Sequence, residues 1–176
     1  MKIKPIYIFN IFLIIIVLAM LFTPLHSYLE KLQGKLPNSE ISSTKETVLT
    51  SEQYNIDLKG INTHDTNFQS FKEKKIFLNF WASWCEPCRE EMPSIQKLYN
   101  RKKNEAQFVL IYMKDNQKEV MKFLQENHYD FPVYEAASPI DPELLPIVFP
   151  TTFIINEKGK ILKKTEKAED WSNFKF

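Results

Sequence analysis

Two cysteines separated by two residues have the most evident chemistry in this sequence. Cys85 and Cys88 are the only cysteines among 176 residues, and Glu86 and Pro87 lie between them. Such a pair can alternate between a dithiol and a disulfide, and the attacking group is a thiolate. A disulfide across so short a loop constrains the unfolded chain little, so it would add little stability. The motif therefore favours redox chemistry over an inert structural disulfide.

The motif is expected where a strand ends and a helix begins. Residues 76–81 form a short apolar run that is typical of a buried strand. A helical pattern starts at about Pro87 and continues to the basic residues 101–103. The positive end of a helix stabilises a thiolate, which predicts Cys85 as the nucleophile. Cys88 lies one turn further into the helix, so we expect it to be more buried and to resolve a mixed disulfide.

The rest of the globular part alternates strand-like and helix-like segments. Residues 108–113 predict a second buried strand, and Asn116 is suited to cap a following helix. Residues 151–155 and 161–164 predict a hairpin with Gly159 in its turn. This order of elements predicts an α/β fold with a mixed β-sheet flanked by helices.

Composition excludes several classes of function. Lys and Arg number 23 against 22 Asp and Glu, so the net charge of +1 gives no basic field for nucleic acid. The three glycines lie far apart, which excludes a P-loop and a dinucleotide-binding glycine turn. The histidines, His26, His64 and His128, are not at a paired-ligand spacing, so half of a zinc site at the two cysteines is disfavoured. No metal and no organic cofactor is predicted.

The N-terminus carries a long apolar segment. Residues 5–25 contain no charge and follow Lys2 and Lys4. At ~1.5 Å per residue, such a helix crosses a hydrocarbon layer of ~30 Å. A cleavable signal peptide has a shorter apolar region and a small-x-small site, and the residues after Phe22 match such a site poorly. We therefore predict an uncleaved signal anchor at residues 1–26, with cleavage as the alternative.

The position of the basic residues predicts the orientation of this anchor. Lysines before a first apolar segment favour an N-terminus in the cytoplasm. The sequence then predicts a single-pass protein of the cytoplasmic membrane whose remaining chain is periplasmic or extracytoplasmic. Residues 27–53 have the polar composition of a spacer, and residues 54–176 are predicted to form the globular domain.

Two motifs carry a family resemblance. Residues 80–93, Phe-Trp-Ala-Ser-Trp-Cys-Glu-Pro-Cys-Arg-Glu-Glu-Met-Pro, resemble the active-site segment of thioredoxin-fold proteins of the membrane-anchored TlpA/ResA-like thiol-disulfide oxidoreductase family. Residues 149–160 resemble the cis-proline strand of this family and its following hairpin. The resemblance covers about residues 54 to 170 and implies a thioredoxin-like sheet.

The resemblance implies roles for further residues. Pro150 matches the cis-proline that faces the disulfide, with an ordinary trans proline as the alternative. Glu91 matches a partly buried acid that moves a proton to or from Cys88, and the alternative is a solvated helix glutamate. Trp84 would shield the disulfide, whereas Trp81 is expected in the core. The substrate-docking residues are predicted to be Trp84, Glu86, Pro87, Phe149 and Pro150.

The sequence departs from the family pattern at three places. Asn79 stands where cytoplasmic thioredoxins have a buried aspartate, which shifts proton handling toward Glu91. Val148 replaces a glycine that often precedes the cis-proline by two positions. Residues 168–176 resemble the start of the last helix of the family, which normally covers one face of the sheet, but stop early.

The cysteine motif and the apolar N-terminal segment predict a membrane-tethered thiol-disulfide oxidoreductase. The family resemblance implies that it reduces disulfides of selected extracytoplasmic proteins, such as apocytochromes before haem attachment. The resemblance implies protein disulfides or thiols as partners and a membrane thiol carrier as electron donor. A peroxiredoxin-type peroxidase is an alternative, although Ala82 stands where its threonine is expected. A redox-inactive module that binds a metal or a partner is the second alternative. The direction of electron flow stays open at this point.

Overall fold

The computed structural model describes residues 47–176. The predicted signal anchor, residues 1–26, lies outside the described residues, and so does the predicted spacer up to residue 46. Among residues 47–176, no helix has the length and apolar character needed to cross a membrane.

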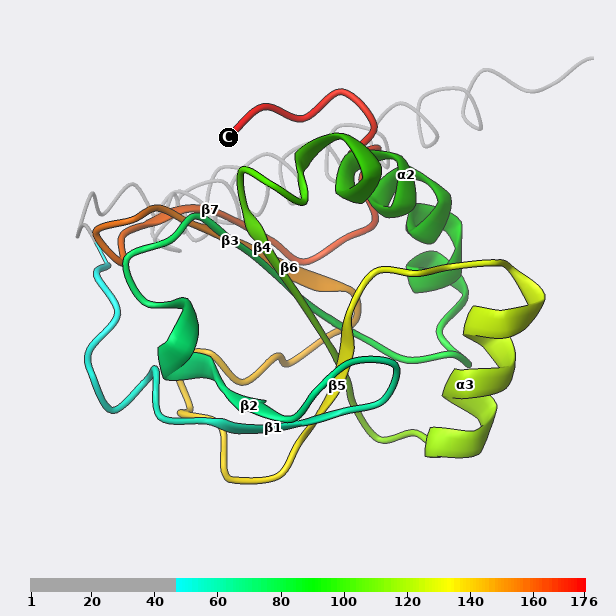
Figure 1. Cartoon of the computed structure of the whole chain (residues 1–176), viewed down its shortest axis with the longest axis horizontal. Helices are drawn as coiled ribbons and strands as arrows, with labels where there is room; N and C mark the ends of the chain where they lie inside the picture. Colours follow the sequence, from blue (N-terminus) through cyan, green and yellow to red (C-terminus); the bar gives the residue numbers. More distant parts are fainter. Residues whose placement is uncertain (1–46) are drawn as a thin grey trace, which may run out of the picture. The chain divides into compact units, whose positions relative to one another are not determined.

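A mixed sheet organises the described part of the chain (Figure 1). Within residues 47–176 it has seven strands in the order β2-β1-β5-β4-β3-β6-β7. Strand β3 pairs in parallel with β4 and antiparallel with β6, and β4 pairs in parallel with β5. The strands are β1 (Asp57–Gly60), β2 (Thr66–Asn67), β3 (Ile76–Trp81), β4 (Gln107–Tyr112), β5 (Val133–Ala136), β6 (Thr151–Ile155) and β7 (Ile161–Thr165). The predicted mixed sheet with flanking helices is confirmed.

Two α-helices and a short 3-10 helix accompany the sheet. Helix α2 spans Glu86–Lys102, α3 spans Gln117–Glu126 and η1 spans Phe68–Phe71. The side chain of Asn116 accepts a hydrogen bond from the backbone N–H of Lys118, so it caps α3 as predicted. The hairpin of β6 and β7 is also confirmed, with Gly159 at a φ of 74° in its turn.

Strand β3 is buried along its whole length and supplies side chains to both faces of the sheet. Phe77 and Trp81 pack in a cluster with residues of α2, α3 and the C-terminal segment. Ile76, Leu78 and Phe80 pack in a second cluster that includes residues of β1 and η1. This alternation follows from the two-residue repeat of a strand. The sheet therefore has a core on each face.

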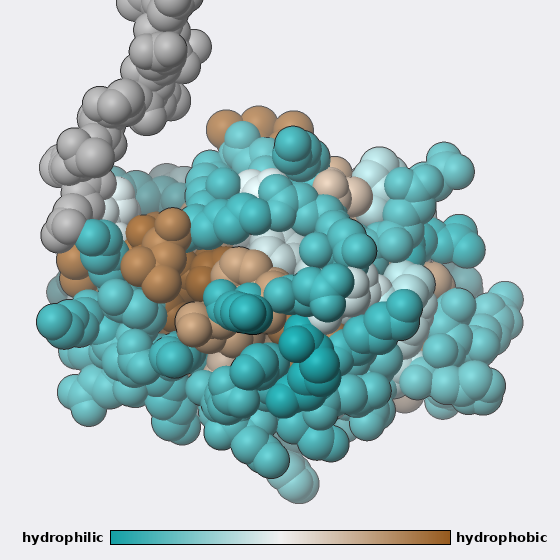
Figure 2. Space-filling model, turned by 90° about the horizontal axis from the view of Figure 1, so that it is seen from above, coloured by the Kyte–Doolittle hydropathy of each residue, from teal (hydrophilic) through white to brown (hydrophobic). Residues whose placement is uncertain are grey.

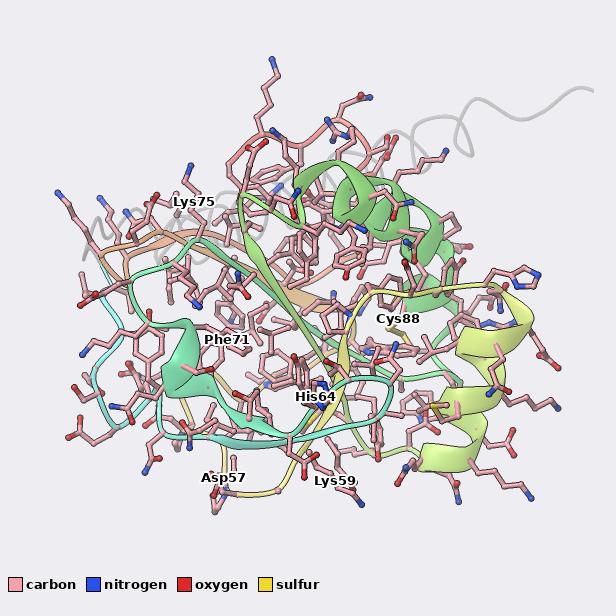
Figure 3. The ribbon with its side chains drawn as sticks, in the orientation of Figure 1. Asp57, Lys59, His64, Phe71, Lys75 and Cys88 are labelled. Carbon is pink, nitrogen blue, oxygen red and sulfur yellow. A yellow bond between two sulfur atoms is a disulfide. The ribbon has the colours of Figure 1, made fainter. Side chains whose placement is uncertain are left out.

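Sequence patterns missed β1, β2, β5 and η1. These elements are short, and Asp57 and Lys59 of β1 are exposed (Figure 3), so β1 shows no apolar run. These segments form strands because they pair with neighbouring strands; for example, Lys59 of β1 lies opposite Glu135 of β5. Local patterning contains little information about such pairing.

The resemblance of residues 168–176 to the start of a helix was misleading. In the structure these residues contain no helix. Trp171 is instead buried at 1% exposure, with its ring 5.0 Å from that of Phe77. Phe174 and Phe176 pack against the same cluster, so the C-terminal segment adds side chains, rather than a further helix, to the face that α2 and α3 cover. Most of the surface in the view from above is hydrophilic, with hydrophobic residues gathered in part of it (Figure 2).

Candidate functional site

The two cysteines form a disulfide at the first turn of α2, where Figure 3 labels Cys88. Cys85 is the N-cap of α2, and its sulfur accepts a hydrogen bond of 3.3 Å from the backbone N–H of Cys88. Cys85 is 6% exposed, while Cys88 is fully buried. The helix end and this N–H donor both stabilise negative charge on Cys85, and only Cys85 is accessible to an incoming group.

Pro150 lies at the end of the sheet from which the cysteine motif departs. Thr151 pairs with Phe80 near the end of β3, and the cysteine motif follows β3 in the chain. The Phe149–Pro150 peptide bond is cis, and Pro150 is buried.

Aromatic and apolar side chains form an exposed rim beside the disulfide. Trp84 is 60% exposed, and its ring lies 6.1 Å from the ring of Phe149 in an edge-on arrangement. The indole N–H of Trp84 donates to the backbone carbonyl of Lys114, which fixes the ring. Glu86 and Pro87 are exposed on the first turn of α2. Four of the predicted docking residues are thus at the surface or partly exposed around the cysteines.

The loop before Pro150 adds apolar residues that sequence reasoning did not select. Leu145, Ile147 and Val148 are all exposed, with Ile147 at 90%. Their only signal in the sequence is an apolar composition without a strand or helix repeat. Exposed apolar side chains in the loop that leads to Phe149 are typical of a contact surface.

Glu91 is buried at 2% exposure, one turn after Cys88 on α2. Its Oε1 atom accepts a hydrogen bond of 2.9 Å from the side-chain amide of Asn79. Its Oε2 atom accepts from the indole N–H of Trp171 at 3.1 Å and from the backbone N–H of Glu169 at 3.3 Å. A solvated helix glutamate would have none of these partners.

The pKa of Glu91 is raised to about 7 because burial removes the carboxylate from water. The hydrogen bonds from Trp171, Asn79 and the backbone of Glu169 lower this pKa, and the charge of Glu169 raises it. Both protonation states are therefore populated near neutral pH. A carboxyl group of this kind can accept and return a proton, and its neighbour one turn earlier is Cys88.

Asn79 is fully buried on β3, and its side chain connects Glu91 on α2 with Thr152 on β6. Its side-chain N–H₂ group donates to Thr152 Oγ1 at 2.8 Å as well as to Glu91. An aspartate here would place a second buried carboxylate beside Glu91, and like charges at this distance oppose ionisation. The amide instead supplies a donor, which suits a site with one titrating acid.

Sequence reasoning did not identify Trp171 or Glu169 as partners of Glu91, or Thr152 as a partner of Asn79. Glu169 and Trp171 lie 78 and 80 residues after Glu91, so no spacing rule connects them. The only signal for Trp171 is a large aromatic residue in a polar segment.

The described residues show no arrangement for a metal ion. Between residues 47 and 176, no group of three or more His, Cys, Asp or Glu side chains is placed to hold one. His26 lies outside the described residues.

Comparisons with known proteins agree with this geometry. A family model described as Redoxin matches residues 37–175. The chain is 34% identical over 107 residues to the thioredoxin-like protein YneN of Bacillus subtilis, which covers 59% of this chain and 63% of YneN. It is 31% identical over 118 residues to the thiol-disulfide oxidoreductase ResA of Bacillus subtilis, which covers 64% of each chain. The chain thus spans slightly less than two thirds of the length of these two relatives.

A solved structure supports the same fold. The crystal structure of StoA from Bacillus subtilis is similar with a TM-score of 0.55 and 30% sequence identity. The match covers 65% of this chain and 89% of StoA. The predicted thioredoxin-like sheet is therefore confirmed.

The buried acid predicts a specific pH dependence of stability in the oxidised protein. Because the pKa of Glu91 is about 7 in the fold and near 4.5 without burial, the native state keeps a proton that the unfolded chain releases between these values. As the pH rises through this window, the free energy of unfolding of the unmodified protein should fall relative to that of Glu91→Gln. The expected fall is a few kcal/mol, about 3 at most. Urea unfolding at several pH values measures this difference.

Glu90→Gln is the matched control, since Glu90 is exposed on the same helix. It should leave the pH dependence of the unfolding free energy unchanged. A constant difference between the unmodified protein and Glu91→Gln from pH 4 to pH 8 would contradict a protonated buried carboxyl.

Proposed function

Because the chain belongs to the Redoxin family, within its TlpA/ResA-like group, we propose that it is a membrane-anchored extracytoplasmic thiol-disulfide oxidoreductase that reduces disulfides of selected proteins. The observation that carries the proposal is the arrangement along α2. Cys85 caps the helix, Cys88 is its buried disulfide partner, and the titrating Glu91 lies one turn beyond.

In the first step, the thiolate of Cys85 attacks one sulfur of a substrate disulfide. The substrate S–S bond breaks, a mixed disulfide forms with Cys85, and the other substrate sulfur leaves as a thiolate that takes a proton from water. The helix end and the N–H of Cys88 stabilise the attacking thiolate.

In the second step, Cys88 resolves the mixed disulfide. Its thiol gives a proton to Glu91, and the resulting thiolate attacks the sulfur of Cys85. The second substrate sulfur leaves as a thiolate and takes a proton from water, and Glu91 returns the proton of Cys88 to water. The substrate thus gains two electrons and two protons while Cys85 and Cys88 become a disulfide. A dithiol donor must then return two electrons to the protein.

The rim around Cys85 provides a docking surface for a polypeptide substrate. Trp84 and Phe149 offer aromatic contacts, and Glu86 and Pro87 are exposed beside them. Pro150 has no backbone N–H, so the backbone at this position donates no hydrogen bond to a substrate strand.

The order of the two steps predicts that Cys88→Ser traps the intermediate. We expect the reduced full-length variant, mixed with excess glutathione disulfide, to retain glutathione on Cys85, because it has no second cysteine thiol to release the adduct. The unmodified protein should lose the adduct as its own disulfide forms. Mass spectrometry of the intact protein measures both species.

Cys85→Ser is the control, and it should gain no glutathione because Cys88 is fully buried. Equal retention of glutathione by the unmodified protein and Cys88→Ser would rule out Cys88 as the resolving thiol, and the absence of any glutathione adduct on Cys88→Ser would support a noncovalent binder instead.

The proposed direction is reduction, with apocytochromes before haem attachment as a candidate substrate and a membrane thiol carrier as donor. We expect the full-length protein, equilibrated in glutathione or dithiothreitol buffers, to show a reduction potential near or below the ~−270 mV of thioredoxin. A potential near ~−120 mV, typical of strong periplasmic oxidants, would instead assign electron flow from substrate to protein.

We also propose that residues 1–26 anchor the protein with the catalytic domain outside the cytoplasm, on the support of the uncharged residues 5–25 after two lysines. The full chain, produced in a bacterium, should stay in the membrane fraction after alkaline carbonate extraction. Protease added to spheroplasts should digest its catalytic domain. A chain lacking residues 1–26 is the control and should be released by carbonate. Release of the full chain would contradict the anchor.

A further inference from the structure

The segment of residues 168–171 lies against α2, beside the buried acid. A surface groove separates the two, and it is lined by Glu90, Glu91, Pro93, Ser94, Lys97, Ala168, Glu169 and Asp170. Glu91 is the one buried residue among those that line this groove.

Trp171 holds this segment in place. Its indole is 1% exposed, with ring centres 5.0 Å from Phe77 and 5.5 Å from Phe174. Its backbone N–H donates to Ser94 Oγ at 3.0 Å, and the Ser94 hydroxyl donates to the backbone carbonyl of Glu91 at 2.7 Å. The same serine therefore connects the segment to the turn of α2 that carries Glu91.

The hydrogen bonds to Glu91 are divided unequally between its two oxygens. Oε2 accepts from both Trp171 and Glu169, whereas Oε1 accepts only from Asn79. Each carboxylate oxygen has two lone pairs, and both donors on Oε2 are N–H groups that cannot accept a proton. Oε1 is consequently the oxygen with a lone pair left for an exchanging proton.

Charged groups approach Glu91 from several elements. Glu90 and Lys97 line the groove from α2, and Glu169 and Asp170 line it from the C-terminal segment. Lys163 on β7 pairs with Glu169, and its ammonium lies 4.9 Å from the centre of the Trp171 ring. From β3 and β6, Asn79 and Thr152 present only neutral groups.

We propose that Trp171 is a positioning residue that, with the backbone of Glu169, fixes Oε2 of Glu91 and so sets the pH range in which Oε1 exchanges a proton with Cys88. This inference rests on the proposed function, because it assumes that Glu91 serves Cys88. The hydrogen bond from Trp171 favours the ionised carboxylate and opposes the effect of burial on the pKa of Glu91. Loss of this donor should therefore keep Glu91 protonated to higher pH.

Trp171→Phe in the full-length oxidised protein is the central test, because phenylalanine retains an aromatic ring and lacks the N–H. We expect the ¹³C NMR titration of the Glu91 side-chain carboxyl, assigned with Glu91→Gln, to shift its midpoint upward by roughly one pH unit. The rate of disulfide reduction by dithiothreitol, divided by the thiolate concentration, should shift its pH profile in the same direction.

Phe174→Leu is the control, since it disturbs packing on Trp171 but removes no donor to Glu91. It should leave the NMR midpoint unchanged. Ser94→Ala is a second variant that loosens the segment and keeps the indole, and we expect a smaller upward shift. Urea unfolding of each variant shows whether it remains folded.

Three outcomes separate the inference from the function on which it rests. An unchanged NMR midpoint in folded Trp171→Phe, or in Ser94→Ala where Trp171→Phe does not fold, overturns the positioning role while trapping by Cys88→Ser remains valid. A shifted NMR midpoint with an unchanged rate profile overturns proton exchange between Glu91 and Cys88. Parallel shifts in both measurements, absent when Trp171→Phe is made in the Glu91→Gln protein, support the inference.

Discussion

The burial of one carboxyl group behind a disulfide is the constraint on which this site depends. An unpaired charge in an apolar core costs several kcal/mol, so Glu91 needs donors on every open side. They come from Asn79 in the centre of the sheet and from the C-terminal segment, which are brought together only by the complete fold. With fewer donors the carboxyl would stay protonated at neutral pH, and with water around it its pKa would be that of an ordinary glutamate.

Helix α2 positions both the cysteine pair and the buried acid. The start of α2 stabilises negative charge on Cys85, and the next turn carries the acid toward the buried core. The spacing of three residues between Cys88 and Glu91 places them on one helix face. The proposed nucleophile, resolving thiol and proton acceptor are therefore ordered along a single helix, and Trp84, which contacts Phe149, directly precedes Cys85.

The sequence predicts the parts of this arrangement that are local. The strand before the cysteines, the helix after them, the Asn116 cap and the final hairpin follow from apolar runs, capping residues and a turn glycine. Strands β1, β2 and β5 could not be predicted because pairing rather than composition makes them strands. The partners of Glu91 in the C-terminal segment, Glu169 and Trp171, could not be predicted because they lie 78 and 80 residues away in the chain. The C-terminal segment resembles the start of a helix in sequence but forms none. Its conformation is instead determined by the packing of Trp171 on Phe77, which the local sequence does not reveal.

The distance in sequence between Glu91 and its donors has a consequence for synthesis. Both cysteines and Glu91 are synthesised well before Glu169 and Trp171, since Trp171 follows Glu91 by 80 residues. A growing chain therefore carries its dithiol while the neighbouring glutamate is still hydrated and ionised at neutral pH. In the proposed mechanism, Glu91 can therefore take its buried position and exchange a proton with Cys88 only after the chain has been extended by a further 80 residues, to Trp171.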